Sequence, residues 1–267
     1  MNAVENSPSP TPRVSVLIPA YNEEALIRSV LESVHGAFAA LADSAAAVPY
    51  EIVVCDNNST DKTAEVAKAY GARVVFEPHN QIARARNTAA ASGLGEWFIF
   101  LDGDTFLNAP LLRATLAALD SGKIGAGGTT VTFDRPQVGV FAAGLTALWN
   151  TISRVLRLAA GSYIFCSRQA WKDTGGFDEE IYAGEELFFS RKLKRWSKNR
   201  SLRFVILSDT PIVTSARKME WYSTGQLLWK VLAMSRPGAM RRREDCDLWY
   251  TRPGDCRGLG PAETPKE

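Results

Sequence analysis

The chain has 267 residues and a mass of 29.2 kDa, enough for one large domain or two small ones with a substantial core. Hydrophobic residues make up 46% and charged residues 22%, which excludes disorder for most of the chain. The 31 Lys and Arg nearly balance the 29 Asp and Glu, so the basic surface of a nucleic-acid-binding protein is not indicated. The two histidines, His35 and His79, are too few for a multi-histidine metal centre. Chemistry in this chain must therefore depend mainly on carboxylates.

The cysteines give no sign of a zinc site or a disulfide scaffold, because none are closely spaced. Cys55 and Cys166 lie in apolar runs and are expected to be small hydrophobic residues of the core. Cys246 and Cys256 are near enough in sequence to pair, but we favour a reduced, cytosolic setting.

Neither a secretion signal nor a membrane span is indicated. Residues 1–13 are rich in Ser and Pro and lack the apolar segment of a signal peptide, which predicts a disordered tail. The most apolar stretch, residues 138–164, is interrupted by Asn150, Arg154, Arg157 and three glycines. We therefore expect a cytoplasmic protein.

Strands and helices alternate through the first hundred residues. Short apolar, β-branched runs predict strands at residues 14–18, 51–55, 73–76 and 97–101, with a helix between each pair. This alternation predicts an α/β fold, with a Rossmann-like, mainly parallel central sheet flanked by helices. Polar clusters at residues 19–23, 56–61 and 102–104 follow three of the strands. Because ligands bind beyond the carboxyl ends of parallel strands, we expect these clusters to share one crevice.

The pattern is looser after residue 105. It predicts helices at 110–119, 185–197 and 219–234, strands at 124–133, 163–166 and 204–207, and an amphipathic segment at 138–160. We expect the apolar face of residues 138–160 to pack mainly into the core. From residue 236 onward Pro, Gly and charged residues dominate.

Asp102-Gly103-Asp104, directly after an apolar strand, is the sharpest local signal for chemistry. Two carboxylates separated by one glycine can reach a hard divalent cation, and the glycine lets a phosphate approach closely. The same residues are also common in solvated turns, so this motif alone leaves both interpretations open. Asp56 likewise ends a strand, where it can contact a nucleobase or ribose or simply cap the following helix.

Further short motifs follow one another in a fixed order. They are Val16-Leu17-Ile18-Pro19-Ala20-Tyr21-Asn22-Glu23-Glu24, Asp56-Asn57-Asn58-Ser59-Thr60-Asp61-Lys62-Thr63, Ala85-Arg86-Asn87, Phe100-Leu101-Asp102-Gly103-Asp104, and Gly175-Gly176-Phe177-Asp178-Glu179 with Gly184-Glu185-Glu186. In order and spacing, over residues 14–217, they resemble the family 2 glycosyltransferases. The resemblance implies a GT-A fold, a nucleotide-diphospho-sugar donor, a Mg²⁺ or Mn²⁺ ion and inversion at the anomeric carbon.

The resemblance also implies roles for residues of the donor site. The expected nucleotide-sugar-binding residues are Pro19, Ala20, Tyr21, Glu23, Asp56, Asn58, Arg86, Asp102 and Gly103. Among them Asp56 would contact the base and Arg86 would face the nucleotide end of the donor. Asp102 would lie near the ribose and the metal, and Asp104 would be the ligand of the ion that bridges the diphosphate. Such an ion neutralises charge that develops on the leaving nucleoside diphosphate.

Inversion requires a base that accepts the proton of the acceptor hydroxyl, and the resemblance places it at Glu185-Glu186. Both residues flank the apolar face of a predicted helix, where partial desolvation raises a carboxylate pKa. Acidic residues also suit any helix N-terminus, and periodicity does not choose between these explanations. The resemblance favours Glu186 as the base, with Glu185 as the alternative.

The chain departs from the family pattern in three places. Asn80-Gln81-Ile82 replaces a glycine that often precedes the Ala-Arg-Asn element, so the local loop is expected to differ. Many relatives supply a late histidine as a metal ligand, and this chain has none after His79. Arg217 and Lys218, in the comparable region, can supply positive charge to the diphosphate or solvate the next helix. The processive motif Q-x-x-R-W is not matched by Gln226 to Lys230, which favours transfer of a single sugar.

The resemblance suggests an organisation in two halves. Residues 14–105 form the nucleotide-sugar-binding half, residues 106–235 the acceptor-binding and catalytic half of the same domain, and residues 236–267 a basic, Pro/Gly-rich tail. The acceptor is unknown, either lipid-linked or a small molecule. Residues 221–234 combine aromatic and apolar residues and precede an Arg-rich cluster, which suits peripheral contact with the inner, anionic face of a membrane.

Other functions compete with a glycosyltransferase. A sugar nucleotidyltransferase should carry a Gly-rich phosphate loop after its first strand, and Pro19-Ala20-Tyr21-Asn22 is not one. A Rossmann dehydrogenase is disfavoured because no G-x-G-x-x-G follows a strand. A non-catalytic nucleotide-sugar-binding protein of the same fold is expected to have lost the Asp102/Asp104 pair or the late carboxylates, and this chain keeps both.

Overall fold

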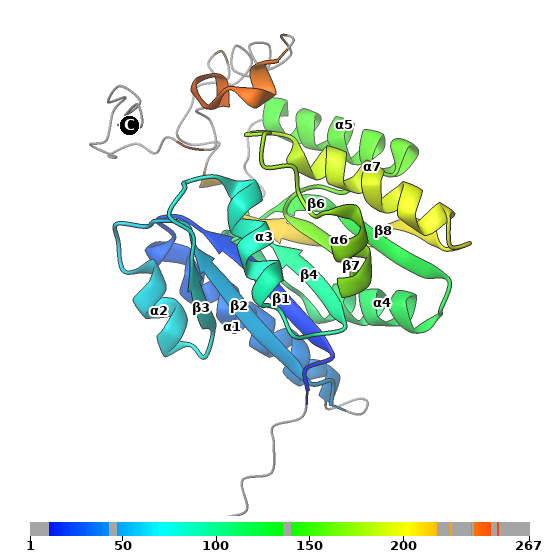
Figure 1. Cartoon of the computed structure of the whole chain (residues 1–267), viewed down its shortest axis with the longest axis horizontal. Coiled ribbons are helices and arrows are strands. Elements are labelled where there is room, and N and C mark those ends of the chain that lie inside the picture. The colour runs from blue at the N-terminus through cyan, green and yellow to red at the C-terminus, as the bar shows by residue number, and fades with distance from the viewer. Residues whose placement is uncertain are drawn as a thin grey trace, which may run out of the picture.

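The computed structural model describes residues 11–42, 47–135, 140–217, 225, 236, 238–246 and 250. Within them, an eight-stranded sheet carries helices on both faces (Figure 1). The strands are β1 (Val14–Ala20), β2 (Tyr50–Asp56), β3 (Arg73–Phe76), β4 (Trp97–Leu101), β5 (Thr105–Phe106), β6 (Ile124–Phe133), β7 (Tyr163–Ser167) and β8 (Arg203–Thr214). The helices are α1 (Glu24–Ala42), α2 (Thr63–Ala69), α3 (Ile82–Ser92), α4 (Ala109–Asp120), α5 (Val140–Leu156), α6 (Arg168–Thr174) and α7 (Glu185–Lys198), with two short 3₁₀ helices, η1 (Ala239–Arg241) and η2 (Arg243–Cys246).

The first four long strands form a parallel unit in the order β3-β2-β1-β4. After β1 the chain builds β2 and β3 on one side, then returns to place β4 on the other side. Adjacent strands on either side of this reversal leave a crevice at their carboxyl ends. The polar residues that follow β1, β2 and β4 therefore meet at one edge of the sheet, as the strand pattern predicts.

The remaining strands continue the sheet in the order β7-β6-β8-β5. β7 is antiparallel to both β4 and β6, β6 is parallel to β8, and β5 is antiparallel to β8. The expected parallel arrangement thus holds through β4, and the sheet is mixed beyond it. β8 is longer than the predicted strand, and α6 and β5 were not predicted, since short elements carry little periodic signal.

Alternate side chains of β1 contribute to two hydrophobic cores, one on each face of the sheet. Val14, Val16 and Ile18 belong to one core and Leu17 to the other, because successive side chains of a strand point to opposite faces. The first core contains the buried side chains of α1 and α4, and the second those of α3, α6 and α7. Cys55 and Cys166 are buried in the second core, as expected.

Among the described helices, α1 alone is long and apolar enough to cross a membrane by length and composition. Its apolar residues lie in the core instead, with Ile27, Val30 and Leu31 fully buried against the sheet.

The prediction that the apolar face of residues 138–160 packs into the core is wrong for much of α5. Leu145, Leu148, Val155 and Leu156 are 39% to 73% exposed. α5 contacts β6 and β8 and lies beside α7 at the rim of the molecule (Figure 1). Periodicity identifies an amphipathic helix correctly, but it does not show whether anything covers the apolar face.

Candidate active site

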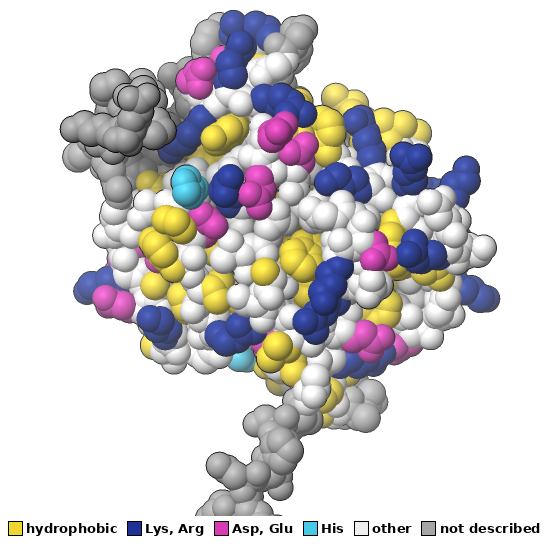
Figure 2. All heavy atoms as spheres, in the orientation of Figure 1, with side chains coloured by type: hydrophobic (Ala, Val, Ile, Leu, Met, Phe, Trp, Pro, Cys, Tyr) yellow, Lys and Arg dark blue, Asp and Glu magenta, His cyan; other side chains and the backbone are white. Residues whose placement is uncertain are grey.

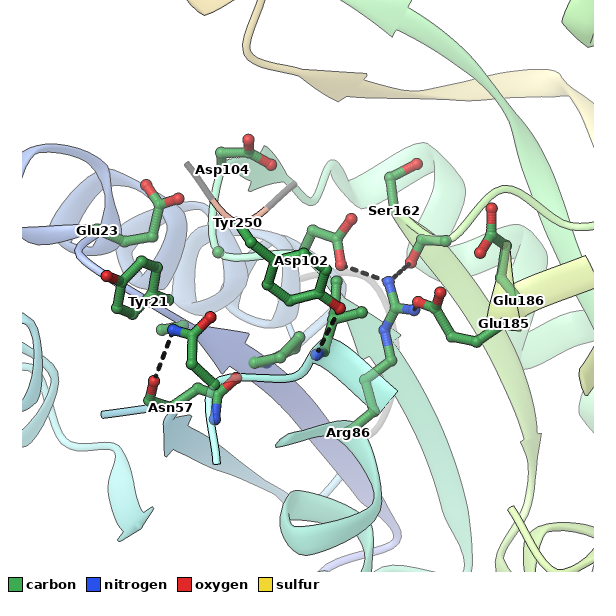
Figure 3. A pocket seen from close by; sticks show the side chains of 16 residues that line it. Tyr21, Glu23, Asn57, Arg86, Asp102, Asp104, Ser162, Glu185, Glu186 and Tyr250 are labelled. Carbon is green, nitrogen blue, oxygen red and sulfur yellow. Dashed lines mark hydrogen bonds and ion pairs between the residues drawn. The ribbon is translucent and has the colours of Figure 1, made fainter. Parts of the chain in front are cut away.

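A cleft of about 170 Å³ lies at the carboxyl ends of β1, β2 and β4, between the two halves of the sheet (Figure 3). Ten of the sequence-predicted site residues line it: Pro19, Ala20, Tyr21, Glu23, Arg86, Asp102, Gly103, Asp104, Glu185 and Glu186. Segments that are far apart in the sequence therefore form one site.

The loop between β1 and α1 is held to the loop before α2 by hydrogen bonds. The backbone N–H of Thr60 donates to Asn22 Oδ1 at 2.8 Å, and the backbone N–H of Glu23 donates to Thr63 Oγ1 at 2.8 Å. Asn22 has a positive φ of 50°, a conformation that Asn tolerates better than most residues. Glu23 is thereby fixed with its carboxylate in the cleft and is 5% exposed.

The cluster after β2 contributes to the cleft through Asn57, not through the predicted Asp56 and Asn58. Asp56 Oδ1 accepts from the backbone N–H of Ser59 at 3.0 Å, a contact within the turn. It does not cap the following helix, because the N-cap of α2 is Lys62. Asn58 has a positive φ of 65°, and its Nδ2 donates to the carbonyl of Pro78 at 3.2 Å. Asn57 lines the cleft, and its Oδ1 accepts from the backbone N–H of Gln81 at 2.9 Å.

The turn after β4 places Asp102, Gly103 and Asp104 together in the cleft. Asp104 is 5% exposed, and its backbone carbonyl accepts from the N–H of Ser215 at 2.9 Å. A Cβ at Gly103 would lie 3.2 Å from both Glu23 Cγ and the Pro19 carbonyl oxygen. Glycine therefore allows this turn to pack directly on the loop after β1.

Arg86 of α3 joins the donor-side turn to α7. Its guanidinium pairs with Glu185, and Nη2 donates to Asp102 Oδ1 at 2.8 Å and to the carbonyl of Gly161 at 3.0 Å. Arg86 is 1% exposed, so the two carboxylates compensate a buried cation. A Cβ at position 161 would lie 2.8 Å from Arg86 Nη2, so only glycine gives the guanidinium this space.

Glu185 and Glu186 begin α7, after Gly184 with a φ of 77°. Glu185 is 3% exposed and paired with Arg86, whereas Glu186 is partly exposed. Burial and the nearby Glu186 raise the pKa of Glu185, against the opposing effect of Arg86. Burial also raises the pKa of Glu186, again opposed by Arg86. Glu186 is therefore the better placed of the two to exchange a proton with a bound molecule.

Arg217 reaches the site indirectly, because its Nη2 donates to Glu23 Oε2 at 2.7 Å. Lys218 lies outside the described residues, as do Cys256 and residues 219–234 except position 225. Residues 221–234, the segment that suggested membrane contact, therefore lie outside the described residues except at position 225.

Six lining residues were not predicted from the sequence: Asn57, Asn80, Ile82, Gly161, Ser162 and Tyr250. Asn57 lies inside the polar cluster at residues 56–61, and that cluster was expected to lie in the crevice. The cluster could therefore have pointed to Asn57. Gly161 and Ser162 immediately precede a predicted strand. Tyr250 carried no local signal: its hydroxyl donates to the carbonyl of Tyr182 at 2.9 Å, a contact across 68 positions. Figure 3 shows its ring among the cleft residues.

Comparison with known proteins shows the family to which the chain belongs. The sequence profile described as Glycosyl transferase family 2 matches residues 15–166, more than half of the chain. The chain therefore belongs to glycosyltransferase family 2. It is 26% identical to the glycosyltransferase AglE of Haloferax volcanii over 195 residues, which cover 69% of this chain and 62% of AglE. The match thus spans less than two thirds of that relative's length.

Solved structures share the fold. The mannosyltransferase PcManGT from Pyrobaculum calidifontis, in complex with GDP-Man and Mn²⁺, aligns with a TM-score of 0.62 and 21% identity, covering 86% of this chain and 63% of that one. Glucosyl-3-phosphoglycerate synthase from Mycobacterium tuberculosis, in complex with Mn²⁺, UDP and glucosyl-3-phosphoglycerate, gives a TM-score of 0.57 and 23% identity, covering 85% and 80%. The predicted GT-A fold is confirmed.

Proposed function

We propose that this chain transfers one sugar from a nucleotide-diphospho-sugar to an acceptor hydroxyl, with inversion at the anomeric carbon. The observation that carries the proposal is the cleft itself. It brings the carboxylates of Asp102 and Asp104 to the same space as Glu186, from segments more than 80 positions apart. Family membership and the nucleotides bound by the structural neighbours support the same reaction.

A divalent ion, Mg²⁺ or Mn²⁺, fits the oxygen donors of the cleft. The described residues contain no group of three His, Cys, Asp or Glu that would hold a metal ion by itself. An ion bound through one or two carboxylates completes its shell with substrate phosphates and water, as Mg²⁺ does in many phosphate sites. Because Asp102 Oδ1 is occupied by Arg86, Asp104 is the main protein ligand in this proposal. When bound, the ion stabilises charge on the leaving nucleoside diphosphate.

The protein's own residues have separate roles in this proposal. Tyr21, Glu23 and Asn57 line the end of the cleft that receives the nucleoside, and Asp102 lies toward its ribose. Glu186 accepts the proton of the acceptor hydroxyl. The acceptor oxygen bonds to the anomeric carbon on the face opposite the nucleoside diphosphate, which leaves. Glu185 and Arg86 position α7 against the turn after β4.

A thermal-shift panel of UDP-glucose, UDP-N-acetylglucosamine and GDP-mannose, each with and without Mn²⁺, tests donor binding. A ligand that binds only the folded state raises the melting temperature by mass action, so one donor should give a concentration-dependent shift that requires the ion. Asp104→Asn should remove the Mn²⁺-dependent part of the shift. Asp209→Asn, at an exposed position outside the cleft, is the matched control.

The products separate this proposal from its alternatives. Incubation of the stabilising donor with an acceptor should release a nucleoside diphosphate. Formation of a nucleoside triphosphate and a sugar 1-phosphate when pyrophosphate is added to the donor would indicate a nucleotidyltransferase. Donor binding with no turnover for any acceptor would indicate a binding protein. A shift that is unchanged in Asp104→Asn would contradict the proposed metal site.

A further inference from the structure

A second cavity, of about 350 Å³, adjoins the cleft at Glu186. Its walls come from β6, α5 and the turn before β7, and three residues line both spaces: Gly161, Ser162 and Glu186. The carboxylate proposed as the base therefore lies at the junction of the two. The side of Glu186 away from the donor cleft is where an acceptor hydroxyl must arrive.

The walls of this cavity are chiefly apolar. The lining residues are Val131, Phe133, Leu145, Thr146, Trp149, Ala160, Gly161, Ser162 and Glu186. Among these described residues none is cationic, and Glu186 is the single charged group. A phosphorylated or carboxylated acceptor would be repelled by Glu186 and would find no cation to pair with. A bare sugar would lose hydration at many hydroxyls against few hydrogen-bonding partners. The lining thus suits a neutral molecule with an apolar part.

α5 is fixed in place as a wall of the cavity by polar contacts. Asn150 Nδ2 donates to the carbonyl of Val131 at 2.8 Å, and Asn150 Oδ1 accepts from the N–H of Val131 at 3.0 Å. These two bonds hold α5 against β6 at the position next to Trp149, which lines the cavity. This wall of the cavity is therefore in place before any ligand arrives, which lowers the entropy cost of binding.

The apolar surface continues beyond the cavity along α5. Leu148, Ile152 and Leu156 follow Leu145 and Trp149 at helical spacing, so they share one face. Leu148 is 57% and Leu156 52% exposed. Figure 2 shows hydrophobic side chains gathered at the upper right edge, over α5. An apolar chain that leaves the cavity can thus remain in contact with apolar surface.

We propose that this cavity binds the acceptor of the proposed transfer reaction, and that the acceptor is a neutral amphiphile. Its hydroxyl-bearing head lies at Glu186, and its apolar part lies against Trp149 and Phe133 and runs out along α5. The identification of the ligand as the acceptor rests on the proposed function, whereas its chemical class follows from the cavity walls.

Binding of three probes to the full chain tests the ligand class: octyl β-D-glucopyranoside below its micellar concentration, methyl β-D-glucopyranoside and glucose 6-phosphate. Titration calorimetry should show the octyl glucoside binding at least about tenfold more tightly than the methyl glucoside, because only the former fills the apolar walls. Glucose 6-phosphate should bind most weakly. Equal binding of the two glucosides, or preference for the phosphate, would overturn the inference.

Substitutions locate the binding site. Trp149→Ala should weaken octyl glucoside binding about tenfold or more, since it removes the largest apolar wall. Leu145→Glu, at a partly exposed position that tolerates a charge, should weaken it as well. Thr151→Ala, at an exposed position of the same helix that lies outside the cavity and off its apolar face, should leave it unchanged. Unaltered binding by both Trp149→Ala and Leu145→Glu would place the ligand elsewhere.

Donor thermal shifts keep the two proposals separate. Trp149→Ala should retain the wild-type shift with the preferred nucleotide sugar, because Trp149 does not line the donor cleft. If octyl glucoside binds here and no nucleotide sugar binds the chain, the proposed function is wrong. If the donor binds and the glucosides do not differ, the amphiphile inference alone is wrong.

Discussion

At the scale of single residues, adjacent glutamates at the start of α7 have different environments. Glu185 is enclosed and paired with Arg86, whereas Glu186 lines both the donor cleft and the apolar cavity. The pKa of Glu186 is raised because burial disfavours its charged form. A carboxylate with a raised pKa that lines both spaces suits the proposed role of general base.

Glu186→Gln should leave donor affinity unchanged and lower kcat by roughly 10²- to 10⁴-fold, the usual contribution of a general base. In the wild-type protein kcat/KM should rise with pH, because only the ionised base accepts a proton. The midpoint should lie above the ordinary Glu value of 4.5, since the pKa is raised. Steady-state kinetics over a pH series measures both effects, with Glu65→Gln at an exposed position as control. Full turnover in Glu186→Gln would assign the base to another group.

At the scale of elements, α5 is attached differently from the other long helices. Its apolar face is largely exposed, and Asn150 ties it to the backbone of β6 at Val131. Burial of apolar area therefore contributes less to holding this helix than it does for α1, whose apolar side lies in the core. The two side-chain hydrogen bonds of Asn150 take on more of that role.

Asn150→Ala should destabilise the attachment of α5 by about 1–3 kcal/mol, because the N–H and carbonyl of Val131 lose their partner. Hydrogen exchange should become faster in residues 140–156 and stay unchanged in β1 and β4. Thr151→Ala is a suitable control, since its hydroxyl donates only within α5, to the carbonyl of Ala147. Equal exchange in wild type and Asn150→Ala would show that packing alone holds the helix.

At the scale of the whole molecule, Arg86 connects the two halves of the fold. It lies on α3 and pairs with Asp102 after β4 and with Glu185 of α7. The Arg86 guanidinium also lies over the ring of Phe177, with 5.2 Å between the guanidinium carbon and the ring centroid. This contact is a further link to the second half. The turn after β4 and the start of α7 are thereby positioned by one buried cation.

Arg86→Met should lower the free energy of unfolding by about 3–5 kcal/mol, because it leaves two carboxylates close together without their cation. Chemical denaturation measures this loss. Arg84→Met, on the same helix but partly exposed, should cost less than about 1 kcal/mol. Adding Glu185→Gln to Arg86→Met should recover part of the stability, since one uncompensated charge is removed. No recovery would show that lost packing, not charge, causes the effect.

Local sequence predicted the features that depend on neighbouring residues. The strands β1 to β4 and the turn Asp102-Gly103-Asp104 were predicted correctly, because apolar runs and turn residues act over a few positions. Which member of the cluster after β2 reaches the cleft was not predictable, because Asp56, Asn57 and Asn58 are all short polar side chains and the backbone direction at each position decides where they point.

The sequence by itself determined the alternation of strands and helices in the first half, the family, and the carboxylates available for chemistry. The tertiary structure decided which of them meet: Arg86 between Asp102 and Glu185, Tyr250 in the cleft, and Glu186 at the junction with an apolar cavity. It also decided that the apolar face of α5 lies open. Periodicity records which side chains share a face, whereas contacts across tens of positions depend on how the elements pack.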